Sequence, residues 1–311
     1  MIKNNIDNDD DKDILPVIIA GGFGLRLQQY LKFKMPKQFI KLLPNGNSLF
    51  QQTLKRVSAI FPKQNILIII NQKHIDIVKR QLKDIGFENY VIICEEECNN
   101  NFVSSLLSCK FAKQNKYKHI FIFPSDHMIE NENNFYVFVE NAIKHTIQND
   151  KHIICGIKPT SANIQYGYIK ISKNNIDQDD IYEVDNFIEK PPFELAIKFI
   201  ENENYLWNSG MFLLNIDTFL KEVKKKQFAS FQAYQQLYFT KINNKIFSFN
   251  TEICNLIIKK SIDYAIIENS KNLICIKANF DWCDVGSFQI LKKLLNENKI
   301  SLTNEQIKKI V

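Results

Sequence analysis

The chain is poor in arginine, has no long apolar run and carries no strongly basic segment, and each scarcity excludes a class of protein. All but three of its 40 basic residues are lysines, which are spread along the sequence and so argue against a nucleic-acid-binding stripe. No apolar run approaches the ~18 residues of a membrane span, and no secretory signal pattern opens the sequence. We therefore expect a cytoplasmic protein that binds neither nucleic acid nor membranes.

Paired cysteines are missing as well. The seven cysteines are an odd number without regular spacing, which resembles neither a disulfide framework nor a zinc site. The other totals are ordinary: 311 residues, 45% hydrophobic and 24% charged, enough for a substantial core. A net charge of +6 suits a small polyanionic substrate.

No linker or internal repeat divides the sequence. Residues 1–13 are polar and contain five aspartates, so we predict a disordered tail. We predict that residues 14–311 form a single domain.

Short continuous apolar runs alternate with amphipathic stretches through the first half of the chain, as in a sheet covered by helices on both faces. This order predicts βαβ units and an α/β fold with a Rossmann-like, mostly parallel sheet flanked by helices. The second half is looser and predicts a small mixed sheet. The expected strands are 15–20, 66–71, 90–94, 120–123, 152–157, 168–172, 182–189 and 210–215, and the expected helices are 48–60, 74–85, 103–115, 134–148, 218–225, 231–238, 262–267 and 287–298.

The most informative segment is residues 16–27, where a β-branched run ends in three glycines within four residues, Gly21, Gly22 and Gly24. Glycine lets a backbone approach a bulky anion, and successive N–H groups can form a concave anion site. Arg26 and Lys37 add two cations nearby, and a planar guanidinium suits phosphate oxygens. The segment predicts a cradle for a nucleoside triphosphate, and a tight turn is the alternative interpretation.

Two better-known glycine loops are excluded. The chain has no G-x-x-x-x-G-K-[ST] string, which a P-loop requires. A dinucleotide fingerprint needs a third glycine where Leu27 stands, and an acidic residue about 20 positions further on that is missing. The other two arginines, Arg56 and Arg80, are interpreted as solvated helix-face residues.

Two aspartates are candidates for holding a divalent cation. Asp126 directly follows an apolar strand in the run 122–127, and Asp284 precedes a predicted helix next to a glycine. Mg²⁺ takes one or two carboxylates together with substrate phosphates, so the pair fits that ion. Taken singly, each could instead be a turn or helix-cap residue.

Three further segments hold polar groups at strand ends. Glu189 and Lys190 stand side by side before two prolines that end the strand, so both could reach one site. Gly167 would let the backbone approach a ligand, and Asn208 places an amide next to a glycine. The alternative for the charged pair is an inconsequential surface ion pair.

In this order, the runs 36–39, 124–127, 207–212, 261–265 and 282–287 resemble the sugar-phosphate nucleotidyltransferases, and most closely the guanylyltransferases that act on mannose 1-phosphate. The resemblance covers about residues 16–295. It implies transfer of GMP from GTP to mannose 1-phosphate, giving GDP-mannose and pyrophosphate, with Mg²⁺ as cofactor. It also implies a nucleotide-binding half at about 14–157, a sugar-binding half at about 158–298 and a possible homodimer.

The resemblance implies a role for each candidate on the nucleotide side. Arg26 would hold the β- and γ-phosphates, and Lys37 would stabilise charge at the α-phosphate. Asp126 and Asp284 would bind Mg²⁺. The nucleotide would lie along the segment formed by Ala20, Gly21, Gly22 and Gly24.

On the sugar side, the resemblance implies that Lys190 holds the attacking phosphate. Glu189, Asn208 and the backbone of Gly167 would contact sugar hydroxyls.

The sequence departs from the family at several positions. Phe23 and Leu25 replace small residues and are expected to narrow the phosphate loop, and an arginine and a proline are missing near position 100. A non-catalytic sugar-nucleotide binder, or an enzyme for another sugar 1-phosphate or nucleotide, therefore remains an alternative.

Overall fold

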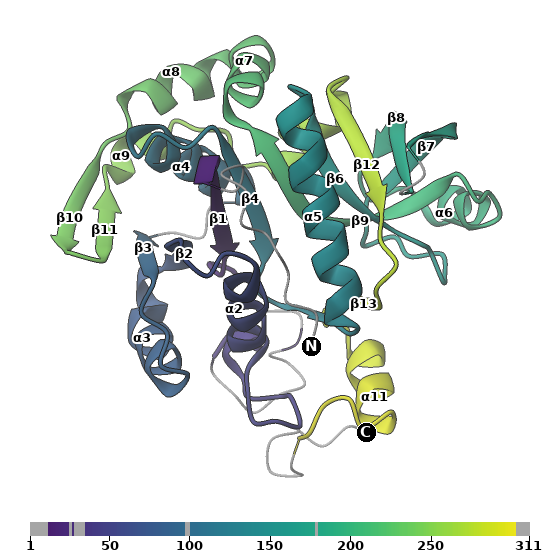
Figure 1. Cartoon of the computed structure of the whole chain (residues 1–311), viewed down its shortest axis with the longest axis horizontal. Coiled ribbons are helices and arrows are strands. Elements are labelled where there is room, and N and C mark those ends of the chain that lie inside the picture. The colour runs from purple at the N-terminus through teal and green to yellow at the C-terminus, as the bar shows by residue number, and fades with distance from the viewer. Residues whose placement is uncertain (1–11, 25–26, 28–34, 97–99, 178–179, 303–311) are drawn as a thin grey trace.

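The computed structural model describes residues 12–24, 27, 35–96, 100–177 and 180–302 (Figure 1). The strands are β1 (Ile14–Ile19), β2 (Ile66–Asn71), β3 (Tyr90–Glu95), β4 (His119–Pro124), β5 (His127–Ile129), β6 (His152–Ile157), β7 (Tyr168–Asp177), β8 (Ile181–Ile188), β9 (Tyr205–Asn215), β10 (Phe239–Asn243), β11 (Ile246–Phe249), β12 (Leu273–Lys277) and β13 (Trp282–Asp284). The α-helices are α2 (Leu49–Ile60), α3 (Ile75–Asp84), α4 (Asn101–Gln114), α5 (Glu132–Gln148), α6 (Phe193–Ile200), α7 (Ile216–Lys226), α8 (Phe228–Gln236), α9 (Thr251–Cys254), α10 (Ile262–Ala265) and α11 (Phe288–Asn296). Short 3₁₀ helices are η2 (Lys37–Phe39), η3 (Gln72–His74) and η4 (Ile267–Asn269).

Eleven strands form one sheet in the order β10-β11-β3-β2-β1-β4-β9-β6-β12-β8-β7. The pairs from β11 through β3, β2 and β1 to β4 are parallel. The βαβ pattern predicted this for β1 to β4, and β11 was not among the expected strands. Beyond β4, only β6 and β12 are parallel, and the other pairs are antiparallel. The sheet is therefore mixed, and the predicted mostly parallel arrangement holds for its first half only.

The predicted small mixed sheet is not separate from the main one. Strand β9 pairs with β4 along its later part and with β7 at its start, Tyr168 lying opposite Trp207. The pairings of β9, β6, β12, β8 and β7 thus return to β9 and close a ring of strands. The closing contact is short, because among the described residues only Tyr168, Ile169 and Lys170 of β7 pair with β9.

The apolar runs are continuous because helices cover both faces of the sheet. In β2, Ile66, Ile68 and Ile70 face one hydrophobic core, which includes residues of α2 and α5. Leu67 and Ile69 face the other core, which includes residues of α4 and α7. Each strand therefore needs apolar side chains at every position, and α5 is seen in front of the sheet in Figure 1.

Local signals set several boundaries correctly. The predicted helix at 48–60 begins with Ser48 as N-cap, whose hydroxyl accepts from the Gln51 N–H while the Gln51 side chain accepts from the Ser48 N–H. This reciprocal capping box is a strong helix start. Strand β9 begins at Tyr205, earlier than the predicted 210, so the run 207–210 lies inside the strand. Patterns did not predict β5, β10 to β13, α6 or α9.

The chain crosses between the two halves more than once. The hairpin β10–β11 comes late in the sequence but lies next to β3, Ile246 pairing with Ile92. The hairpin therefore extends the sheet on the side of the early strands.

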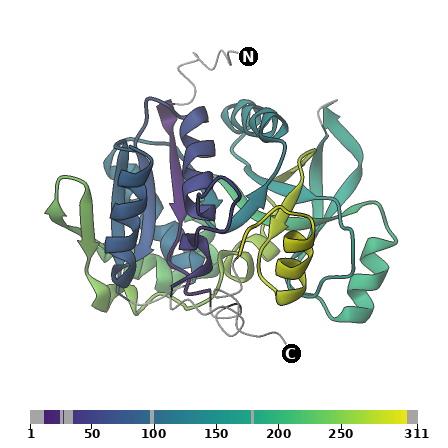
Figure 2. The same cartoon turned by 90° about the horizontal axis from the view of Figure 1, so that it is seen from below.

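The carboxyl ends of the central strands share one side of the molecule with β13 and α11. In Figure 1 the arrows of β1 and β4 point downward toward these elements, and Figure 2 looks onto this side, with α11 in yellow. Ligands of open α/β sheets bind beyond the carboxyl ends of the strands. The fold thus directs attention to this side.

Most of the expected tail, residues 1–11, lies outside the described residues. Asp13 is already part of the fold, because its carbonyl oxygen accepts from the Lys118 N–H at 2.8 Å. No helix within the described ranges has both the length and the apolar character needed to span a bilayer.

We predict that His152 makes the fold acid-sensitive. His152 is fully buried in β6, neither ring nitrogen has a hydrogen-bond partner, and burial lowers its pKa from 6.5 to about 4. As pH falls from 6.5 toward 4, His152 becomes protonated in the unfolded chain and stays neutral in the folded chain. The free energy of unfolding therefore falls by about 3 kcal/mol over this range. Chemical denaturation at several pH values should show a flatter acid limb for His152→Leu than for the wild type. Equal acid limbs in the two proteins would contradict this prediction.

Candidate active site

The glycine loop is anchored between two strands and η2. The Ala20 N–H donates to the Ile69 carbonyl at 2.8 Å, which ties the end of β1 to β2. Gly24 has a φ of +61°, and a Cβ there would lie 3.1 Å from the backbone nitrogen of Lys37. Glycine is therefore needed at position 24, because the backbone is left-handed and touches the segment that carries Lys37.

Gln38 fixes the shape of this loop. Its side chain is 3% exposed, and its Nε2 donates to the carbonyls of Ala20 at 3.2 Å and Gly22 at 2.7 Å. Gln38 lies within the run 36–39, from which no role was predicted for it. The available signal for a role of Gln38 was its amide side chain, directly after the candidate Lys37.

The structure brings Lys37, Asp126 and Asp284 to one point. The Lys37 Nζ lies 3.0 Å from Asp126 Oδ2 and 2.6 Å from Asp284 Oδ1, and it donates to the Val285 carbonyl at 2.8 Å. The Lys37 side chain is 6% exposed and the two carboxylates are 31% and 16% exposed. These residues come from η2, from the turn after β4 and from the end of β13.

The small sheet of β5 and β13 aligns the two aspartates. Asp284 pairs with His127, the residue after Asp126. The Trp282 Nε1 donates to His127 Nδ1 at 3.1 Å, which adds a side-chain bond between the two strands. Two acids that are far apart in sequence therefore lie side by side.

Electrostatics keep Lys37 and Asp126 ionised. Burial by itself would lower the pKa of the Lys37 ammonium, but the two carboxylates outweigh burial and the pKa is raised. Burial would likewise raise the pKa of Asp126, but the charge and hydrogen bond of Lys37, together with His127 and a backbone hydrogen bond, outweigh burial and lower the pKa to about 2. At neutral pH Lys37 is therefore a cation and Asp126 an anion.

A cavity of about 510 Å³, which we call the loop cavity, lies between the glycine loop and this trio. Its lining includes Gly21, Gly22, Gly24, Lys37, Glu95 and Asp126. The volume is in the range of small-molecule sites. The ring of Phe23 packs edge-on against His74, with centroids 5.3 Å apart, so part of its bulk, expected to narrow the loop, lies against η3.

Glu95 is a site candidate that sequence reasoning missed. It ends β3, is 1% exposed and accepts from the Ser104 hydroxyl at 2.7 Å. A Cβ on Gly21 would lie 3.5 Å from Glu95 Oε2, which places this carboxyl beside the start of the loop. Burial raises its pKa to about 8, against the opposing effect of the Ser104 bond. Its position at the carboxyl end of a parallel strand was the available signal.

The three arginines have different fates. Arg26 lies outside the described residues, so its predicted phosphate contact stays a prediction. Arg80 is exposed, as expected. The prediction that Arg56 is solvated was wrong, because Arg56 is only 3% exposed. Its guanidinium lies over the Phe135 ring, 5.4 Å from the ring centroid, and its Nε lies 3.6 Å from Glu132 Oε1. Arg56 lies on the buried face of α2. Its position in the predicted helix did not show that this face is buried.

The candidates predicted for the sugar side form a second cluster. A Cβ on Gly167 would lie 2.5 Å from Glu189 Oε2, so no side chain fits there. Glu189 forms an ion pair with Lys190, and the Asn208 N–H donates to the Gly167 carbonyl at 2.8 Å. Lys190 itself has a φ of +51°, a strained conformation for a lysine that often marks functional sites.

Asp263, in the run 261–265, joins this cluster without a predicted role. It is 7% exposed, and its Oδ1 accepts from Asn208 Nδ2 at 2.8 Å, while Asn208 Oδ1 accepts from the Gly210 N–H at 3.0 Å. Both ends of the Asn208 amide are therefore engaged within the protein. Asn208 positions Asp263 and the turn of β9 in addition to any contact with a ligand.

Neighbouring strands bring the two clusters together. Gly210 lies two residues after Asn208, and a Cβ there would lie 3.5 Å from the Pro124 ring and 4.0 Å from His127. Pro124 in turn precedes Asp126 by two residues. The antiparallel pairing of β4 with β9 thus places the Asn208 cluster next to the Asp126 trio.

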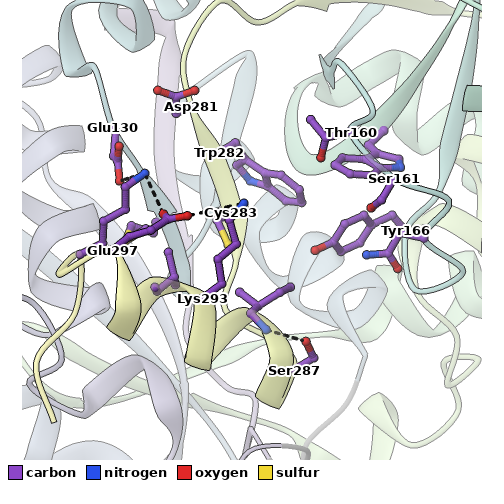
Figure 3. Close-up of a pocket in the computed structure, with 16 residues that line it drawn as sticks. Glu130, Thr160, Ser161, Tyr166, Asp281, Trp282, Cys283, Ser287, Lys293 and Glu297 are labelled. Carbon is purple, nitrogen blue, oxygen red and sulfur yellow. Dashed lines mark hydrogen bonds and ion pairs between the residues drawn. The ribbon is translucent and has the colours of Figure 1, made fainter.

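A second cavity of about 470 Å³ is lined by residues of β13 and α11, and we call it the aromatic cavity (Figure 3). Its lining includes Tyr166, Trp207 and Trp282, and the Tyr166 centroid lies 5.1 Å from that of Trp207 and 5.2 Å from that of Trp282. Figure 3 shows Trp282 turned toward Tyr166, with Lys293 projecting from α11 below. Tyr166 and Trp207 directly precede Gly167 and Asn208, and Trp282 lies two residues before Asp284. The contacts among the three rings therefore link these segments.

The acids suit a magnesium ion that is completed by a ligand. No group of three acidic, histidine or cysteine side chains in the described part of the chain could hold a metal ion alone. Asp126 and Asp284, however, present oxygens within 3.0 Å of a common point. Mg²⁺ accepts one or two carboxylates plus phosphate oxygens, so the residues fit this ion.

Comparison with known proteins identifies the family. The family model described as nucleotidyl transferase matches residues 15–299. The chain belongs to this family. The solved structure described as mannose-1-phosphate geranyltransferase from Thermus thermophilus shares 20% identity with a TM-score of 0.77, covering 91% of this chain and 79% of that one. This likeness shows a shared fold, with a mixed sheet and covering helices.

Two curated relatives are named mannose-1-phosphate guanylyltransferase. The protein from Salmonella muenchen is 32% identical over 291 residues, which is 89% of this chain and 59% of the relative. The protein from Escherichia coli is 30% identical over 294 residues, which is 90% of this chain and 61% of the relative. The chain thus spans about 60% of the length of these relatives.

We predict that Asp263→Asn lowers the pKa of Glu189. Burial and the charge of the neighbouring Asp263 together raise that pKa to about 7, against the opposing effect of Lys190. Asparagine keeps an oxygen for the Asn208 amide and removes the charge. Carbon-13 NMR titration of the glutamate carboxyls, with Glu189→Gln for assignment, measures the change. Glu268→Gln should lower it less, because its effect is smaller, and an unchanged pKa in Asp263→Asn would contradict the prediction.

Proposed function

We propose that this protein transfers GMP from GTP to mannose 1-phosphate, giving GDP-mannose and pyrophosphate. The carrying observation is the convergence of Lys37, Asp126 and Asp284 beside the glycine loop. Both curated relatives described above are named for this activity.

In this reaction a phosphate oxygen of the sugar attacks the α-phosphorus of GTP, and the bond to the β-phosphate breaks to release pyrophosphate. No covalent intermediate with the protein is needed, so catalysis consists of positioning and charge neutralisation. The glycine loop, shaped by Gln38, would carry the triphosphate. Lys37 would offset charge at the α-phosphate, and Arg26 would hold the β- and γ-phosphates.

Mg²⁺, held by Asp126 and Asp284, would supply a divalent charge to neutralise the phosphates. The residues of the second cluster would orient the sugar. Lys190 would hold the attacking phosphate, and Glu189 would accept hydrogen bonds from sugar hydroxyls at a wall kept open by Gly167.

A substrate panel tests the proposal. Purified protein is mixed with Mg²⁺, one of GTP, ATP or UTP, and mannose 1-phosphate or glucose 1-phosphate. We expect pyrophosphate release and GDP-mannose, identified by mass spectrometry, with the first member of each set. Asp126→Asn and Asp284→Asn should each lower kcat by about 100-fold or more, because each removes charge that stabilises the transition state.

Other results of the panel would replace the proposal. Preference for another pair would change the substrates and keep the reaction class. Binding of GDP-mannose by calorimetry without turnover of any pair would indicate a non-catalytic binder.

We predict that Glu95 reads the base. Glu95 lines the loop cavity beside Gly21. Guanine presents adjacent N–H donors, which match the two oxygens of a carboxylate, so binding of this base would favour the ionised form of Glu95 and lower its pKa from about 8. Glu95→Gln replaces one acceptor by a donor, so the preference for GTP over ATP in kcat/KM should fall by about tenfold or more. The matched control is Glu96→Gln, which changes the exposed neighbour and should leave the preference unchanged. Equal preferences in Glu95→Gln and the wild type would contradict the prediction.

A further inference from the structure

The Lys37 ammonium occupies the point where the two proposed magnesium-holding carboxylates converge. Three oxygens surround it, one each from Asp126, Asp284 and the Val285 carbonyl, at 3.0, 2.6 and 2.8 Å. An ammonium group has three donors, so this environment satisfies it completely. Lys37 thus serves as the counter-ion of the acidic pair.

A metal ion and this ammonium cannot share the carboxylate pair in this arrangement. Mg²⁺ requires its oxygen ligands at ~2.0–2.1 Å, and the ammonium already lies between the two oxygens. Two cations held together there would also repel each other strongly, because the partly buried site screens charge poorly. The ammonium must therefore leave before both acids can hold one ion.

The loop cavity provides the place to which Lys37 can move. Lys37 lines this cavity together with the glycine loop, and a Cβ on Gly24 would lie 3.3 Å from the Lys37 Cγ. A phosphate group seated over the loop would therefore lie beside the stem of this side chain. Its negative charge could replace the carboxylates as the partner of the ammonium.

We propose that Lys37 is an exchangeable counter-ion that keeps divalent metal out of the free protein. A nucleoside triphosphate draws the ammonium away, and the two acids then accept the metal. Metal binding is thereby coupled to nucleotide binding, although metal and nucleotide contact different side chains. This inference rests on the proposed function for the identity of the nucleotide and deepens the role given there to Lys37.

The experiment measures Mn²⁺ binding without nucleotide, by electron paramagnetic resonance of the unbound ion. The wild type should bind weakly. Lys37→Met leaves two adjacent carboxylates without their cation, so it should bind Mn²⁺ at least about tenfold more tightly. Adding Asp126→Asn to Lys37→Met should abolish the gain.

The matched control is Lys41→Met, which removes a lysine four residues away. Lys41 is exposed and pairs with Asp84 at 3.1 Å, so its loss should leave Mn²⁺ binding at the wild-type level. Lys37→Gln is the second variant. Its neutral amide can still donate to a carboxylate, which protects folding if methionine disrupts it.

Thermal unfolding provides an independent readout. A ligand that binds only the folded state raises the melting temperature. Mg²⁺ alone should therefore stabilise Lys37→Met and Lys37→Gln, and should leave the wild type and Lys41→Met unchanged.

Two results would overturn the inference: Lys37 variants that bind Mn²⁺ no more tightly than the wild type, or a wild type that binds Mn²⁺ alone as tightly as the variants. Because no nucleotide is present, these results are independent of the transfer assay. A protein without transferase activity that shows the gain would support the counter-ion role and contradict the proposed function. Transferase activity without the gain would do the reverse.

Discussion

The site is organised around one ion cluster, the Lys37 ammonium between Asp126 and Asp284. Two acids placed together would repel each other, and a buried lysine without acids would lose its charge. The raised pKa of Lys37 therefore depends on the two carboxylates, and the low pKa of Asp126 depends on the Lys37 ammonium. The glycine loop depends on the same segment, since Gly24 packs against Lys37 and Gln38 holds the loop carbonyls.

The mixed sheet makes this cluster possible. Parallel strands deliver the glycine loop and Asp126 to the same side of the molecule, while the antiparallel β9 carries Asn208 next to them. The late strand β13 then pairs with β5 and brings Asp284 across. Closure of the strand ring through β9 and β7 fixes the position of the Gly167 and Glu189 cluster relative to β4.

The aromatic residues at β13 complete the support. Trp282 donates to His127 and contacts Tyr166, so one ring touches elements of both clusters. Such contacts restrict side-chain movement where a reaction depends on positioning. Several glycines of the chain also mark tight packing, because a Cβ at Gly156, Gly167 or Gly286 would lie less than 3.0 Å from a neighbouring side chain.

The sequence by itself determined the local elements and the chemistry of the candidate side chains. Continuous apolar runs predicted β1 to β4 and β6, and the Ser48 cap marked the start of α2. These features depend on residues that are close in sequence, so the hydrophobic pattern and the cap residues predict them. The hairpin β10–β11 went unpredicted because β10 is largely exposed and has no continuous apolar run. Strand β12 is a buried apolar run like those that were predicted, and it was overlooked.

Only the tertiary structure decided which distant groups meet. It joined the late strands to the first sheet, buried Arg56 on the inner face of α2, placed Glu95 at the glycine loop and put Asp126 and Asp284 on one cation. The physical reason is that strand pairing and helix packing between segments far apart in sequence depend on the shape of the whole core. A residue's type and local spacing tell what it can bind, and long-range packing decides what lies within its reach.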